Sequence, residues 1–163
     1  MALKADRYEL QTDISFFYND SAVSRGGVVV HDSTTASGAA MDQGVNLVKY
    51  KAAASTDVPV GILLNDVVNK DLTRTHLNQH KDEVQKGGKV TILRKGYVVT
   101  NLITGTPNVG DVAYACDTTA GNISVGAVSA AASGALGIGR FMTDKDEDGY
   151  AKVEINLPYG HAS

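Results

Sequence analysis

The sequence predicts a mainly β protein, a small β-sandwich or barrel-like single domain, and three observations support this prediction. The chain has 163 residues, which is the usual size of one domain. Several short stretches alternate apolar and polar residues with a period of two, as strands with one buried face do. Glycine occupies 17 positions, and glycine turns separate these stretches.

The two clearest strands lie in the C-terminal half. In residues 152–157, lysine, glutamate and asparagine alternate with three apolar residues, so one face is polar and the other apolar. In residues 111–117, aspartate and alanine alternate with Val112, Tyr114 and Cys116. This pattern places Cys116 on the inward side of its strand, where a buried and inert thiol is expected.

Weaker alternation predicts the remaining strands. In chain order they lie around residues 14–18, 28–30, 45–47, 58–64, 90–92 and 97–100. The turn signals between strands are glycine pairs at 26–27 and 87–88, Thr-Pro-Asn at 106–108, Ala-Gly-Asn at 120–122 and Asp-Gly at 148–149. Short strands at this spacing are typical of a sandwich or a barrel.

Two segments depart from the strand pattern. Residues 1–25 are predicted to form an N-terminal arm that becomes ordered on a partner, with residues 26–163 forming the β-rich domain. The alternative is that this segment is the first strand of the core. Residues 66–86 are mostly polar and are predicted to form a long excursion with at most a short helix. An excursion this long in a small domain is usually functional.

The net charge of −3 conceals a segregated distribution. Residues 70–95 hold seven basic and three acidic residues, a net charge of +4, whereas the segments on either side are both acidic. We call residues 70–95 the basic island. The sequence pI of about 5.7 argues against general nucleic-acid binding, so the island needs a local explanation.

The composition restricts the cellular compartment in which the protein is expected and the kinds of disulfide or metal site that it can have. The single cysteine excludes an internal disulfide and any multi-cysteine metal site, which fits a reducing compartment. The first residues lack the apolar core of a signal peptide, and no stretch approaches the ~20 apolar residues that span a bilayer. We therefore expect a protein made in the cytoplasm that is not a membrane protein.

Two partial metal motifs fail on inspection. Residues 144–149 match the opening of a calcium-binding loop, but the bidentate glutamate of such a loop belongs at a position that Ile155 occupies. An acidic, solvated turn is the favoured interpretation. His76 and His80 have the spacing of two zinc ligands on one helical turn, but no motif supplies a third ligand. We predict no metal and no cofactor.

Catalytic motifs are also incomplete. Residues 122–126 lack the first glycine of a nucleophile elbow, and the glycines of residues 134–139 stand in the wrong order for a dinucleotide-binding loop. The sequence therefore predicts that the protein is not an enzyme.

Four segments carry a family resemblance: GGKVTILRKGYVVT at 87–100, GTPNVGDVAY at 105–114, GIGRFM at 137–142 and VEINL at 153–157. Together they resemble the capsid decoration proteins of tailed bacteriophages, also called cement or head-stabilising proteins. The resemblance covers about residues 58–158.

The resemblance implies a structural virion protein on the outer surface of the capsid. Such a protein cements adjacent subunits of the major capsid protein and has no active site, and it is made in the host cytoplasm. Oligomers are common in the family, so a homotrimer is favoured and a dimer is the runner-up. Neither a nucleic acid nor a membrane is implied as a partner.

The basic island and the aromatic arm supply the capsid-contact candidates. Lysine and arginine of the island could dock on an acidic capsid surface, and the aromatic rings of the arm could lie in a capsid groove or add a strand to a sheet edge. The candidates are Tyr8, Phe16, Phe17, Tyr18, Arg74, Lys81, Lys86 and Lys89. The alternative is that the island is a solvated loop.

A second function class is a ligand-binding or carbohydrate-binding β module of a phage surface appendage. Such a module needs a patch of exposed aromatic side chains. The chain has no tryptophan and only 6% aromatic residues, which disfavours this alternative.

Overall fold

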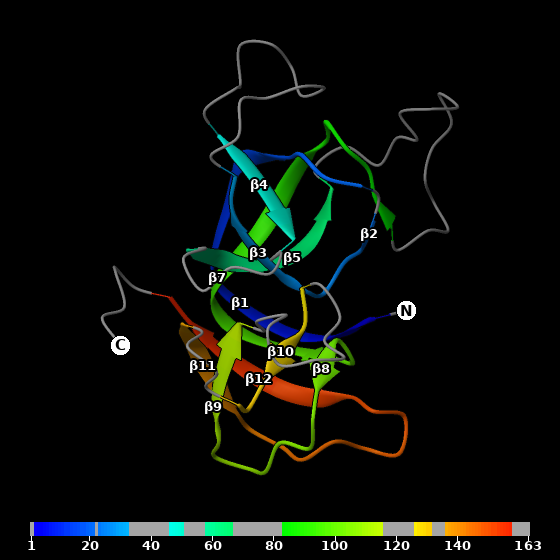
Figure 1. Cartoon of the computed structure of the whole chain (residues 1–163), viewed down its shortest axis with the longest axis vertical. Coiled ribbons are helices and arrows are strands. Elements are labelled where there is room, and N and C mark those ends of the chain that lie inside the picture. Colours follow the sequence, from blue (N-terminus) through cyan, green and yellow to red (C-terminus); the bar gives the residue numbers. More distant parts are fainter. Residues whose placement is uncertain are drawn as a thin grey trace.

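The computed structural model describes residues 2–21, 23–32, 46–50, 58–66, 83–115, 126–131 and 136–157. Every regular element in these ranges is a strand, so the predicted mainly β fold is confirmed (Figure 1). The strands are β1 (Leu3–Tyr18), β2 (Val23–Ser24), β3 (Val28–His31), β4 (Leu47–Tyr50), β5 (Pro59–Asp66), β6 (Glu83–Val84), β7 (Lys89–Thr100), β8 (Ile103–Thr104), β9 (Val112–Ala115), β10 (Val128–Ser129), β11 (Gly137–Phe141) and β12 (Ala151–Asn156).

Five strands pair in a closed ring in the upper part of Figure 1. β1 pairs in parallel with β4, and the antiparallel pairs β4–β3, β3–β5, β5–β7 and β7–β1 complete the ring. The ring closes at the C-terminal end of β1, where Phe17 and Tyr18 pair with β4, and closure of this kind is how barrels avoid free sheet ends. The upper part is therefore barrel-like.

A second set of strands continues from the other half of β7. Residues 95–100 of β7 pair with β12, and β11, β9, β10 and β8 follow in that order in the lower part of Figure 1. β1 remains paired with β7 throughout, from Leu3 opposite Thr100 to Phe17 opposite Lys89. The β1–β7 ribbon thus runs through both parts of the molecule.

Two hydrophobic cores lie on opposite faces of β3, β5 and β7, and these three strands contribute side chains to both cores. The upper core contains Tyr18, Val29, Val48, Tyr50, Val60, Leu63, Val84, Val90 and Ile92. The lower core contains Leu3, Val28, Ile62, Leu64, Leu93, Val98, Ala113, Ala115, Val128, Ile138, Phe141, Ala151, Val153 and Ile155. Successive residues of β3, β5 and β7 enter different cores because strand side chains alternate between faces. Strands buried on both faces explain the uninterrupted apolar runs at 28–30 and 62–64.

Residues 3–18 form a paired strand, which is the alternative to the predicted arm. Both ends of β1 are anchored, since Leu3 is 2% exposed in the lower core and Tyr18 is 0% exposed in the upper core. Between them the strand is mostly solvent-exposed. The sequence suggested an arm because its alternating aromatic and polar residues gave little indication of what would anchor the segment.

The predicted excursion lies mostly outside the described residues. Residues 67–82 are not described, so the predicted short helix and the histidine pair at 76 and 80 cannot be placed. The end of the segment is described: β6 pairs with β2, and a turn at residues 86–87 leads into β7. Gly87 has a φ of 87°, which favours glycine at this turn.

The strand at 112–115 has the predicted position but the opposite orientation. Ala113 and Ala115 are fully buried, whereas Val112 is 39% exposed and Tyr114 is half-buried. The inward side faces a core that Phe141 and Ile138 already fill, so only small side chains fit there. Cys116, predicted to point inward, lies outside the described residues.

The strand at 151–156 matches its prediction in both position and orientation. Val153 and Ile155 are fully buried, and Glu154 points to solvent. None of the described segments is a helix long and apolar enough to cross a membrane.

Candidate functional site

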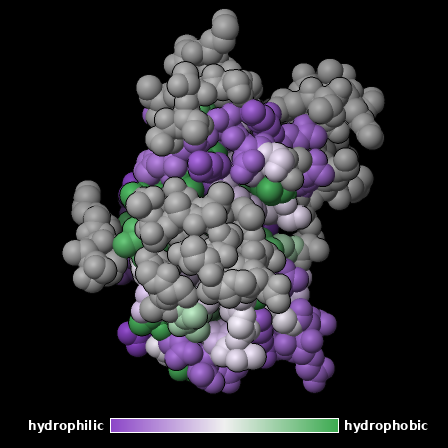
Figure 2. All heavy atoms as spheres, in the orientation of Figure 1, coloured by the Kyte–Doolittle hydropathy of each residue, from purple (hydrophilic) through white to green (hydrophobic). Residues whose placement is uncertain are grey.

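Three of the predicted contact residues come together where β7 begins. Phe17 lies opposite Lys89 in the β1–β7 pair, and the Lys89 Nζ atom is 5.9 Å from the centre of the Phe17 ring. Lys86 lies in the preceding turn, and both lysine side chains are exposed. We call Phe17, Lys86 and Lys89 the basic end. It lies at the upper end of the molecule, where the described surface in Figure 2 is mainly hydrophilic.

Tyr18 fixes the turn that carries the basic end. Its backbone N–H donates to the oxygen of Gly88 at 2.9 Å, and its own oxygen accepts from the N–H of Gly87 at 2.8 Å. Its side chain is fully buried, its hydroxyl donates to the Ser21 oxygen at 3.0 Å, and burial raises its pKa. Tyr18 therefore supports this surface from the core and presents no side chain to a partner.

Phe16 lies beside the basic end but belongs partly to the interior. Its ring is half-buried against the upper core and packs edge-on against His31, with 5.5 Å between the ring centres. An aromatic side chain in this position can contribute its exposed edge to a contact while its other edge remains in the protein.

Tyr8 lies far from the other aromatic candidates. Tyr8 and Phe17 are nine positions apart in β1, a distance of about 30 Å in a regular strand. Tyr8 is 53% exposed and stacks on Tyr97, with ring centres 6.0 Å apart, and the Lys152 Nζ atom lies 3.6 Å from the centre of the Tyr97 ring. The structure thus divides the predicted aromatic set between two places.

The outer edge of β1 is poorly suited to pairing with an added strand. Among the described strands only β4 pairs with this edge, at Phe17 and Tyr18. The register of β1 against β7 shifts four times, and such irregularities discourage edge-to-edge pairing. In addition, the Ser15 N–H donates to the Asp13 carboxylate at 2.8 Å, so this edge group is occupied.

Two predicted candidates, Arg74 and Lys81, lie outside the described residues. The predicted acidic turn at 144–149 is described, and two of its carboxylates, those of Asp144 and Asp146, accept hydrogen bonds. Asp146 accepts from the backbone N–H groups of Asp148 and Tyr150 and from the Lys4 Nζ atom, at 3.1, 2.7 and 3.0 Å. These hydrogen bonds hold the pKa of the Asp146 carboxyl below its ordinary value, with the Lys4 bond as the largest cause. In the described ranges, no three His, Cys, Asp or Glu side chains are grouped as a metal site.

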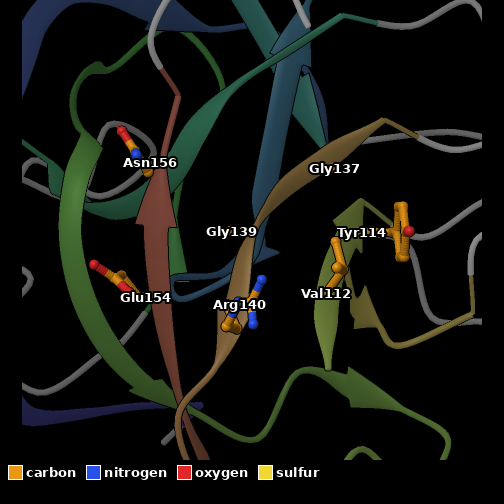
Figure 3. A pocket seen from close by; sticks show the side chains of 7 residues that line it. All are labelled: Val112, Tyr114, Gly137, Gly139, Arg140, Glu154 and Asn156. Carbon is orange, nitrogen blue, oxygen red and sulfur yellow. The ribbon is translucent and has the colours of Figure 1, made fainter. Parts of the chain in front are cut away.

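The lower half carries a hollow that the sequence analysis did not identify (Figure 3). It has a volume of about 470 Å³ and lies on the outer face of β9, β11 and β12. Val112 and Tyr114 form its apolar side, and its polar lining consists of Arg140, Glu154 and Asn156. Gly137 has no side chain and leaves space open beside Val112 and Tyr114. The signal that could have revealed it is a glycine in β11 that lies between outward-pointing side chains of the two neighbouring strands.

A family model described as structural cement protein (E217 gp24/Pam3 gp6) matches residues 11–156. No curated protein matches the chain. The matched range begins within β1 and ends at the last residue of β12, so it includes residues of both hydrophobic cores. The predicted resemblance is confirmed, and the chain belongs to the structural cement protein family of bacteriophages, whose members stabilise the capsid of the virion.

Proposed function

We propose that this protein binds the outer surface of the phage capsid and joins adjacent subunits of the major capsid protein. The observation that carries the proposal is the family match over residues 11–156. The exposed lysines of the basic end are consistent with a protein that works through its surface.

The basic end is the proposed first contact with the capsid. Lys86 and Lys89 are exposed and lie beside the half-buried Phe17, so a partner can meet cationic and aromatic groups together. Charged groups at such a contact steer association and set its orientation more than they add affinity. The other proposed contact residues are Tyr8, Phe16, Arg74 and Lys81. Tyr18 is omitted because its side chain is buried.

A homotrimer is the proposed oligomeric state, with a dimer as the alternative. An oligomer presents several copies of the basic end at once. Each additional contact then forms at a high effective concentration, so modest individual affinities combine into a stable attachment.

Co-sedimentation with shells of the cognate capsid protein tests the function. Wild-type protein should pellet with the shells and raise the temperature at which they break open. A protein that remains in the supernatant at low and physiological salt would contradict the proposal.

Association kinetics test the role of the basic end. Exposed charges are screened beyond about 10 Å at 0.1 M salt, so Lys86→Gln with Lys89→Gln should slow association and flatten its salt dependence. Lys95→Gln is the matched control, because Lys95 is an exposed lysine of the same strand that lies outside the basic end. Because the control removes one charge and the test variant two, a control effect half as large as that of the double variant would assign the salt dependence to net charge alone.

A further inference from the structure

The lower end of the molecule exposes three large apolar side chains close together. Val109 is 64% exposed, Met142 is 45% exposed and Val112 is 39% exposed. The backbone segments that carry them lie side by side, because the Gly110 N–H before β9 donates to the Phe141 oxygen at the end of β11 at 2.8 Å. Figure 1 shows these loops at the opposite end of the molecule from the start of β7.

Hydrogen bonds hold these loops in place. The Val109 N–H donates to the Asp144 carboxylate, and the Phe141 N–H donates to the Asp111 oxygen, each at 2.8 Å. Asp111 also accepts from the Asn108 N–H at 2.8 Å within its own turn. A surface that is already ordered loses little conformational entropy when it binds, so the entropic penalty for burying its apolar side chains against a partner is small.

The hollow continues this apolar surface along β9. Val112 belongs both to the exposed group and to the wall of the hollow, and Tyr114 extends the wall. A Cβ atom on Gly137 would lie 3.7 Å from Val112, an ordinary contact distance, so a side chain from outside has room there. We call Val109, Val112, Tyr114, Gly137 and Met142 the lower-end surface.

The charges around the lower-end surface indicate the chemistry of its partner. The two loops carry the carboxylates of Asp111, Asp144, Asp146, Glu147 and Asp148. Lys4 pairs with Asp146, and Arg140 lines the hollow opposite Val112. The one lysine of the two loops, Lys145, donates from Nζ to the Ile103 oxygen at 3.1 Å. The carboxylates outnumber these cations, so the surround has a net negative charge, and an apolar surface of this kind is complementary to an apolar side chain flanked by lysine or arginine.

We propose that the lower-end surface is a second capsid contact, which binds an apolar side chain with cationic neighbours on an adjacent capsid subunit. This inference rests on the proposed function. The basic end and the lower-end surface lie at opposite ends and have opposite charge, so one copy can hold two subunits of the shell. Two weak contacts linked in this way bind far more tightly than either alone.

Three sets of variants test the proposal on capsid shells. Val109→Ser with Met142→Ser removes the exposed apolar groups, Gly137→Leu fills the hollow, and Glu147→Lys with Asp148→Lys reverses the surrounding charge. Val58→Ser is the matched control, because Val58 is 54% exposed but lies outside this surface. Melting of the free proteins checks that each variant is folded.

Each lower-end variant should bind shells about tenfold or more weakly than wild type, since linked contacts contribute about 100-fold or more. Bound variants should also fail to raise the temperature at which the shells break open, whereas Val58→Ser should behave as wild type. Unchanged binding and shell stability in the folded variants would overturn the lower-end contact alone. Absence of wild-type binding would overturn the proposed function and this inference together. Loss of self-association by the same variants in the absence of shells would assign the surface to a second copy instead.

Discussion

Ile92 and Leu93 are neighbours in β7, yet their side chains lie in different hydrophobic cores. Ile92 packs in the upper core and Leu93 in the lower core, and both are fully buried. The backbone of one strand therefore links the two cores. A protein of this design is expected to lose both cores together when it unfolds.

Alanine substitution at either position tests this coupling. Ile92→Ala and Leu93→Ala should each lower the free energy of unfolding by about 2–5 kcal/mol, the usual range for a buried leucine or isoleucine. Chemical denaturation followed by tyrosine fluorescence and by far-UV circular dichroism should give one transition at the same midpoint for both signals. Separate midpoints would show that the upper and lower parts unfold independently.

Deletion of residues 2–20 tests whether β1 is needed for folding. The deletion removes Leu3 from the lower core and Tyr18 from the upper core, along with the whole β1–β7 pairing. The truncated protein should show no cooperative melting transition. Leu10→Ser is the control, because Leu10 is 58% exposed in the middle of β1 and its replacement should leave the melting temperature nearly unchanged. A truncated protein that melts like the full chain would restore the interpretation of this segment as an arm.

The part of the fold that the sequence could predict was the strands that have one solvent-exposed face. Lys152 and Glu154 mark the outer face of β12, so Val153 and Ile155 could be assigned to the core. In β9 the same reasoning gave the wrong face, because alanine is apolar enough to be buried and Val112 and Tyr114 line a hollow. The orientation of β9 was decided by the size of the side chains that fit at a crowded position. A single sequence does not report how crowded a position is.

The functional surfaces depend on contacts between distant parts of the chain. Phe17 and Lys89 were both named from sequence, but only the antiparallel register of β1 and β7 brings them together. Val109 and Met142 were not identified, because Val109 lies in a turn, Met142 follows the end of β11, and the proximity of these two segments depends on the Gly110–Phe141 hydrogen bond. Local patterns cannot report such a pairing.

Two glycines of β11 should respond in opposite ways to alanine. A Cβ atom on Gly139 would lie 1.8 Å from the Glu154 oxygen, so Gly139→Ala must move β12 and should cost about 3 kcal/mol or more. Gly137→Ala makes only ordinary contacts and should be neutral or stabilise by up to about 1 kcal/mol, because glycine is unfavourable in a strand. Denaturant midpoints measure both effects. Equal destabilisation by the two changes would contradict the pairing of Gly139 against β12.

Acid should weaken the turn between β11 and β12 through Asp146. Its carboxylate accepts hydrogen bonds from Lys4 and from the Tyr150 N–H, and these lower its pKa below the ordinary aspartate value of about 3.9. A group whose pKa is lower in the folded state adds stability above the pKa of the unfolded chain. That stability is lost as the pH falls below about 4 and through the folded pKa. An NMR titration of the Asp146 carboxyl carbon should therefore have its midpoint below 3.9.

The same ion pair predicts how two aspartate variants differ. Asp146→Asn removes the charge that Lys4 contacts at 3.0 Å, so the variant should lose less stability than wild type between pH 5 and about pH 3. Asp148→Asn is the control, because it removes one charge from the same turn but leaves the Lys4 and Tyr150 bonds to Asp146 intact. Its stability should fall with acid as that of wild type does. If Asp146→Asn retained the full acid dependence of the wild type, the Lys4–Asp146 pair would not link β1 to this turn in solution.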